Sequence, residues 1–157
     1  MVRAVPAGAS HRFVVESTST TPIRMAAVDS VMKILKSGDH VVCSDDVYGG
    51  VSRMYNNLIV NYDISFSYVN SSNPKEVEEA IQDNTKLIWI ETPTNPLLKV
   101  TDLDAVGKIA KKHGILYGVD STFSTPALLR PLEFGADIVQ HSTTKYLSGH
   151  NQIIGGV

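Results

Sequence analysis

Short apolar runs alternate with segments of helical periodicity along most of this chain, and this alternation constrains the fold more than any other feature. Apolar residues recur at helical spacing over residues 25–35, 51–60, 74–81 and 102–113. Strand-like runs occupy residues 40–43, 64–69, 86–91, 115–119 and 136–139. Strands that alternate with helices form βαβ units, so we predict an α/β fold with a mainly parallel sheet flanked by helices.

Turn residues stand between these elements. Gly38 and Gly114 follow two of the helical patterns, where a left-handed residue ends a helix. Pro74 suits the first turn of a helix. Residues 92–96 must be irregular, because Pro93 and Pro96 exclude a helix and an interior strand there.

Polar side chains cluster directly after four of the predicted strands, at residues 45–48, 91–95, 120–122 and 142–145. Ligands of parallel sheets bind beyond the carboxyl ends of the strands, and those ends meet at one edge. The sequence therefore predicts that all four clusters contribute to a single site.

Lys145 is the most informative member of these clusters. A lysine can form a Schiff base with an aldehyde, and the Ser142 and Thr144 hydroxyls beside it can bind a phosphate. Asp120 ends an apolar run and can keep a pyridinium nitrogen protonated. Together these residues form the parts of a pyridoxal phosphate (PLP) site. The alternatives are a surface lysine and a helix N-cap aspartate.

Two further residues have a functional and a structural interpretation. The Tyr48 ring could stack on a flat cofactor, or it could simply be an aromatic side chain that packs in a loop. Asn95 can reach the phenolic oxygen of PLP, or form an Asx-type turn. The spacing of His113, His141 and His150 does not indicate a metal site.

Composition excludes several other classes of protein. A net charge of -2 argues against nucleic-acid binding, and no apolar run approaches the roughly 20 residues of a membrane span. The single cysteine, Cys43, indicates a reducing compartment, and we expect the cytoplasm. Residues 1–22 have the composition of a transit peptide or of an irregular leader, and we favour the leader.

The ordered motifs of the chain resemble the Cys/Met-metabolism family of PLP enzymes. The markers include SDDVYGG at 44–50, ETPTNP at 91–96, RPL at 130–132 and STTKYLSGH at 142–150. The resemblance covers residues 25–157 and implies the large PLP-binding domain of the aspartate-aminotransferase type, fold type I. We expect residues 23–157 to form part of that domain, with the small C-terminal domain of the family outside this sequence.

The resemblance also implies roles for individual residues. Lys145 would carry the cofactor and act in catalysis, and Tyr48 would stack on the ring and assist the leaving group. The remaining cofactor-binding residues would be Asp120 for the ring nitrogen, Asn95 for the phenolic oxygen, and Ser142, Thr144 and the Met25 amide for the phosphate.

The function implied is trans-sulfuration of a small sulfur amino acid, most like the γ-elimination of cystathionine by cystathionine γ-lyase. Cystathionine γ-synthase and methionine γ-lyase are the alternatives, and the intact family enzymes form homotetramers. A second alternative is an inactive fragment that pairs with full-length subunits. An unrelated nucleotide-binding module is disfavoured, because no glycine-rich fingerprint follows a strand and opens a helix.

The chain departs from the family pattern at Arg24. The family has Ser-Gly-Met-Ala-Ala where this chain has Ile-Arg-Met-Ala-Ala at 23–27. Backbone amides there would hold the phosphate at a helix N-terminus, and the Arg24 side chain can interfere with close approach. Nothing in residues 1–22 matches the N-terminal segment that reaches a neighbouring subunit. We therefore expect little catalytic activity from this chain alone.

Overall fold

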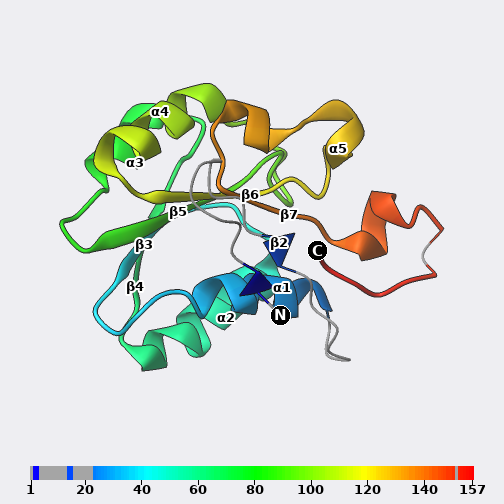
Figure 1. Ribbon diagram of the computed structural model, residues 1–157, viewed down its shortest axis with the longest axis horizontal. Coiled ribbons are helices and arrows are strands. Elements are labelled where there is room, and N and C mark those ends of the chain that lie inside the picture. The colour runs from blue at the N-terminus through cyan, green and yellow to red at the C-terminus, as the bar shows by residue number, and fades with distance from the viewer. Residues whose placement is uncertain (1, 4–13, 16–22, 151) are drawn as a thin grey trace.

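The central feature of the computed structural model is a five-stranded sheet, and all of its strands are parallel (Figure 1). The structure describes residues 2–3, 14–15, 23–150 and 152–157. The strands are β3 (His40–Ser44), β4 (Ser65–Val69), β5 (Thr85–Glu91), β6 (Leu116–Asp120) and β7 (Ile138–Gln140). The predicted α/β fold with a mainly parallel sheet is confirmed.

The strands lie in the order β4-β3-β5-β6-β7. The chain runs from β3 to its neighbour β4 on one side, and then from β4 across β3 to β5 on the other side, after which β6 and β7 follow outward. Such a reversal is a topological switch point, and ligands of α/β proteins bind beyond the carboxyl ends of the strands around it.

Helices cover both faces of the sheet (Figure 1). On one face α1 (Ile23–Met32) and α2 (Gly49–Asn57) pack on a core that includes Val41, Trp89 and Ile138. On the other face α3 (Pro74–Glu79) and α4 (Leu103–His113) enclose a second core with Ile88 and Val119. Both cores are apolar, because strands buried on two faces carry apolar residues in every position.

Local sequence explains where the helices begin and end. The Asp102 carboxylate accepts a hydrogen bond of 3.0 Å from the Ala105 N–H and caps α4, and Gly114 ends that helix at a φ of 66°. Asn73 caps α3 through the Lys75 N–H.

Three helices end earlier than predicted, and one of them, α3, ends at Glu79 instead of at residue 81. α1 ends at Met32 because Ile34 and Leu35 bond to carbonyls three residues back, which tightens the chain into a 3₁₀-like turn. α2 ends at Asn57, and a 3₁₀ helix, η1 (Ile59–Tyr62), follows it. Asn residues have low helix propensity, and the pair at 56–57 coincides with this break.

Trp89 of β5 lies against Gly118 of β6 on the neighbouring strand. A Cβ atom added at Gly118 would lie 2.7 Å from the Trp89 ring, so this position has room only for glycine. Trp89, the largest fully buried side chain, thus has room for its ring because Gly118 carries no side chain.

The remaining elements are short. They are α5 (Thr125–Leu128), η2 (Pro131–Phe134), the wide turn η3 (Thr143–Leu147), and the antiparallel pair β1 (Val2–Arg3) and β2 (Val14–Val15). The rest of the segment predicted as a leader lies outside the described residues, so the domain boundary at residues 22 and 23 stays a prediction. In the part of the chain that is described, no helix has the length and apolarity needed to cross a membrane.

Candidate functional site

A cavity of about 560 Å³ lies at the carboxyl ends of the strands. Six of the seven predicted site residues line it, and they come from segments far apart in the sequence. They are Met25, Tyr48, Asn95, Ser142, Thr144 and Lys145. The seventh, Asp120, lies in a smaller pocket that shares Arg24 and Phe123 with this cavity. The predicted convergence at one sheet edge is therefore present, and the roles of the residues stay predictions.

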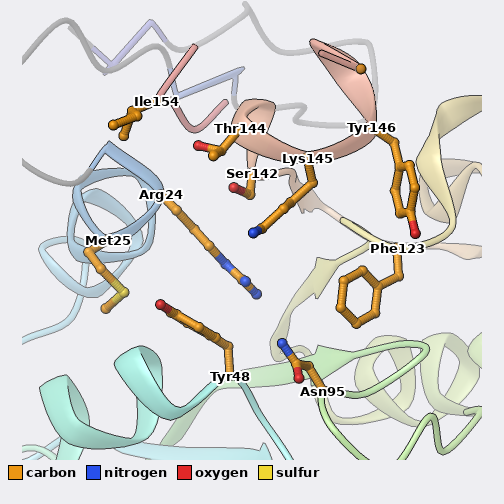
Figure 2. Close-up of a pocket in the computed structure, with 11 residues that line it drawn as sticks. Arg24, Met25, Tyr48, Asn95, Phe123, Ser142, Thr144, Lys145, Tyr146 and Ile154 are labelled. Atoms are coloured by element: carbon orange, nitrogen blue, oxygen red, sulfur yellow. The ribbon is translucent and has the colours of Figure 1, made fainter. Parts of the chain in front are cut away.

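Tyr48 is held in the loop between β3 and α2. Its backbone N–H donates a hydrogen bond of 2.9 Å to Oε2 of Glu91, which ends β5. A Cβ atom at Gly50 would lie 3.0 Å from Sδ of Met25 and would overlap the Tyr48 ring. Gly50, two residues after the tyrosine, thus leaves space for the Tyr48 ring, which turns toward the cavity (Figure 2).

The loop after β5 presents Asn95 to the cavity. Asp46 accepts hydrogen bonds from the Thr94 hydroxyl and, at 3.0 Å, from the Leu97 N–H. Lys99 pairs with Asp45 at 2.8 Å. The acidic pair after β3 therefore fixes the loop after β5, and the Asn95 amide points into the same space as Tyr48 and Lys145 (Figure 2).

Asp120 ends β6 and is fully buried. Its Oδ1 accepts hydrogen bonds from the Thr122 N–H at 3.0 Å and the Thr122 hydroxyl at 2.6 Å. The Thr122 hydroxyl in turn accepts one of 2.9 Å from the Ser142 N–H. The alternative prediction of a helix N-cap is wrong, because the next helix begins only at Thr125 and its N-cap is Ser124.

Lys145 lies in η3, directly after β7. Its side chain extends into the cavity and approaches the centre of the site (Figure 2). Beside it, the Thr144 hydroxyl accepts a hydrogen bond of 3.0 Å from the Gly155 N–H. A Cβ atom at Gly155 would collide with Thr143. A glycine is therefore required at residue 155, where the C-terminal segment pairs with the chain after β7.

Arg24 extends across the middle of the site from the first turn of α1 (Figure 2). Its Nη2 donates to Oδ2 of Asp120 at 2.6 Å and lies 3.4 Å from Oε2 of Glu91. Its guanidinium carbon lies 4.3 Å from the centre of the Tyr48 ring. Although arginine is rarely buried, Arg24 is only 8% exposed.

The carboxyl groups of Glu91 and Asp120 are the buried acidic groups of the site. Burial, and then the neighbouring charge of Asp120, raise the pKa of Glu91 to about 8. Burial also lowers the pKa of His141, which precedes the Ser142–Lys145 segment. A buried cation, Arg24, faces both carboxylates, and a proton on Glu91 would neutralise the group.

Sequence reasoning did not assign a role to three residues that define the floor of the site. Glu91 and Thr122 belong to the polar clusters after β5 and β6, so their position was predicted although their hydrogen bonds were not. Phe123 lines both pockets and meets Tyr146 edge to face, with ring centres 6.4 Å apart. An isolated aromatic residue in a turn gives no signal in the sequence.

The donor set fits pyridoxal phosphate. It offers an amine, an aromatic face, a buried carboxylate, an amide and two hydroxyls around one cavity, the groups that PLP sites use. Arg24 occupies the approach to Asp120 and is the one residue that does not suit the cofactor. Among the described residues, no cluster of His, Cys, Asp or Glu could hold a metal ion.

Residues 14–157 match the family described as Cys/Met metabolism PLP-dependent enzyme. The chain is 54% identical over 133 residues to the cystathionine gamma-lyase of Bacillus subtilis (strain 168), which covers 85% of this chain and 35% of that protein. It is 53% identical over 132 residues to the cystathionine beta-lyase MetC of Staphylococcus haemolyticus (strain JCSC1435), with 84% and 34% covered. Proteins named cystathionine gamma-synthase also match.

The fold is also that of solved structures. The crystal structure of metB from Corynebacterium glutamicum superposes with a TM-score of 0.84 at 46% sequence identity, over 86% of this chain and 35% of that one. The chain therefore spans about a third of the length of the proteins it matches.

Proposed function

The chain belongs to the Cys/Met metabolism PLP-dependent enzyme family, and from that premise we propose that it binds PLP around Lys145 for the trans-sulfuration of sulfur amino acids. One observation carries the proposal. The loops after β3 and β5 and the segment after β7 bring Tyr48, Asn95 and Lys145 to one cavity, with Asp120 beneath it at the end of β6.

Each of these residues has a role in holding the cofactor. The Lys145 amine is the group to which the cofactor aldehyde would bind, and the Tyr48 ring offers a face for stacking. Asp120 would pair with the ring nitrogen, and Asn95 with the phenolic oxygen. The Ser142 and Thr144 hydroxyls and the N-terminal turn of α1 at Met25 would bind the phosphate.

When bound, PLP supplies an electron sink that stabilises negative charge at the α-carbon of an amino acid. Lys145 Nζ would act as a general base and take the proton from that carbon. It would then act as a general acid and donate the proton to another atom of the reacting substrate. The Tyr48 hydroxyl would assist departure of the sulfur-containing group.

Among substrates we favour cystathionine, cleaved at the γ-carbon, with the γ-synthase and methionine γ-lyase reactions as alternatives. Relatives named as gamma-lyase and beta-lyase are almost equally similar, at 54% and 53% identity. Sequence identity therefore does not distinguish the position of cleavage, and product analysis with cystathionine will do so. Cysteine with 2-oxobutanoate indicates γ-elimination, whereas homocysteine with pyruvate indicates β-elimination.

Covalent trapping tests the cofactor proposal. The chain is incubated with PLP, reduced with borohydride and digested, and the modified lysine is found by mass spectrometry. We expect the adduct on Lys145, its loss in Lys145→Ala, and its retention in Lys75→Ala, which removes an exposed lysine of α3. Equal labelling of Lys145 and surface lysines would contradict the proposal.

An apolar surface supports the second candidate function, pairing with a full-length subunit of the same family. Leu97, Leu98, Val100 and Leu128 are 66%, 62%, 67% and 84% exposed. Val100 and Leu128 line one hollow, and exposed apolar residues that lie together are typical of interaction surfaces. Co-expression with a tagged full-length relative tests this candidate, and Val100→Asp with Leu128→Asp should abolish co-purification if this surface is responsible.

A further inference from the structure

We propose that Arg24 is a built-in occupant of the cofactor-ring subsite, so that it competes with PLP and sets the affinity of this chain for the cofactor. The inference rests on the proposed function, because it concerns the same cavity. Arg24 stands at the position where the family pattern has a glycine.

The contacts of Arg24 are the ones assigned to the cofactor ring. Its guanidinium lies 4.3 Å from the centre of the Tyr48 ring, on the face proposed for stacking. Its Nη2 lies 2.6 Å from Oδ2 of Asp120, the carboxylate proposed for the ring nitrogen. Both recognition elements of the ring are therefore engaged by one side chain.

The chemistry of the two groups is similar. A guanidinium is planar, delocalised and always charged, and it stacks on aromatic rings while its N–H groups pair with carboxylates. A protonated pyridine ring is likewise a flat cation with an N–H donor. Tyr48 and Asp120 thus form a subsite for a planar cation, and such a subsite accepts either group.

Arg24 is held imperfectly in this position. Its Nε is buried and has no hydrogen-bond partner within the described part of the chain. The same side chain lines the open cavity, so it has space into which it can withdraw. An unsatisfied buried donor lowers the stability of the bound arrangement and favours exchange with a better ligand.

Competition of this kind reduces apparent affinity by the fraction of molecules with a free subsite. If Arg24 occupies the subsite in about nine molecules of ten, PLP binds about tenfold more weakly than the subsite alone would allow. Removal of the guanidinium should therefore raise the affinity for PLP by the same factor. It should also destabilise the cofactor-free chain, because the buried Asp120 carboxylate loses its counter-charge.

The experiment compares the wild type with Arg24→Ala, Arg24→Lys and the control Arg130→Ala, which removes an exposed arginine paired with Glu133. PLP affinity is measured by quenching of the single tryptophan, Trp89, and the melting temperature is measured without cofactor. We expect Arg24→Ala to bind PLP about tenfold more tightly and to melt at a lower temperature. Arg130→Ala should match the wild type in both.

The opposite signs of these two effects are the diagnostic result, since a purely structural role would lower affinity and stability together. Low concentrations of guanidinium ion should raise the melting temperature of Arg24→Ala and weaken its PLP binding. If Arg24→Ala does not fold, Arg24→Lys provides the same test, with a smaller gain in affinity because it keeps the charge and loses the planar group.

Unchanged or weaker PLP binding by a folded Arg24 variant would overturn the inference and leave the proposed function standing. Failure of every variant and of the wild type to bind PLP at Lys145 would overturn the proposed function, and the inference with it. The two failures are therefore distinguishable.

Discussion

Glu91 and Asp120 are directly opposite each other, as register partners at the carboxyl ends of the neighbouring strands β5 and β6. Both are buried, and both contact the Arg24 guanidinium. Two acids this close, with one cation between them, favour a proton on one of the acids.

Stability should therefore depend on the protonation of Glu91. Burial and Asp120 raise its pKa from 4.5 to about 8, although Arg24 and the Tyr48 N–H oppose the shift. The folded state then holds a proton that the unfolded chain has released, so stability is complete below about pH 4.5 and falls as the pH rises to about 8. Urea unfolding between these pH values measures the effect.

Glu91→Gln is the control for that dependence. The amide keeps an oxygen to accept from the Tyr48 N–H and cannot ionise, so stability should become flatter over the same pH range. An unchanged slope in Glu91→Gln would show that another group is responsible.

Tyr48→Leu should destabilise the cofactor-free protein by about 1–2 kcal/mol, because it removes the aromatic face beneath a buried guanidinium. Tyr48→Phe keeps that face and should lie close to the wild type in thermal unfolding. For PLP binding, Tyr48→Leu should lower affinity, in contrast to Arg24→Ala. Equal stability of the Leu and Phe variants would refute the stacking contribution.

Gly118→Ala should cost about 1–3 kcal/mol in the free energy of unfolding, because the added methyl group has to displace the Trp89 ring. Gly49→Ala is the matched control, since the nearest atom to its Cβ would be a flexible Arg53 nitrogen at 3.4 Å. Urea denaturation followed by Trp89 fluorescence reports on both variants, and a Gly118→Ala variant as stable as Gly49→Ala would contradict this packing.

Asp102→Ala should destabilise the protein by about 1 kcal/mol, because the Ala105 N–H loses its capping acceptor. Asp104→Ala, in the first turn of the same helix, removes only an exposed ion pair with Lys108 and should change stability by less than about 0.5 kcal/mol. Circular dichroism during urea unfolding gives the comparison. Similar losses in the two variants would show that the cap is not the source.

The sequence was sufficient for the fold because local signals and tertiary structure agree here. The run of residues 86–91 is apolar enough to be a strand buried on both faces, and Asp102 and Gly114 bracket α4 at the predicted positions. The helical pattern of 51–60 was less reliable. It continues past Asn57 because Ile59 packs in the core from a 3₁₀ turn, so burial there does not require an α-helix.

The location of the candidate site could be predicted from the sequence, whereas most of the contacts within it could not. Polar residues after parallel strands meet at one edge, which gave Tyr48, Asn95, Asp120 and Lys145. The conformation of one long side chain, Arg24, is not encoded in any local pattern. It follows from the three-dimensional coincidence of two acids and an aromatic ring, which only the structure reveals.

The position of the reactive groups in the sheet has a consequence for hydrogen exchange. The acids end the interior strands β5 and β6, whereas Lys145 follows β7, the last strand on its side of the described sheet. Local opening requires less free energy at such margins than in the centre. Amides of η3 should therefore exchange faster than those of β5 and β6, and the lysine can sample other positions while the acids stay in place.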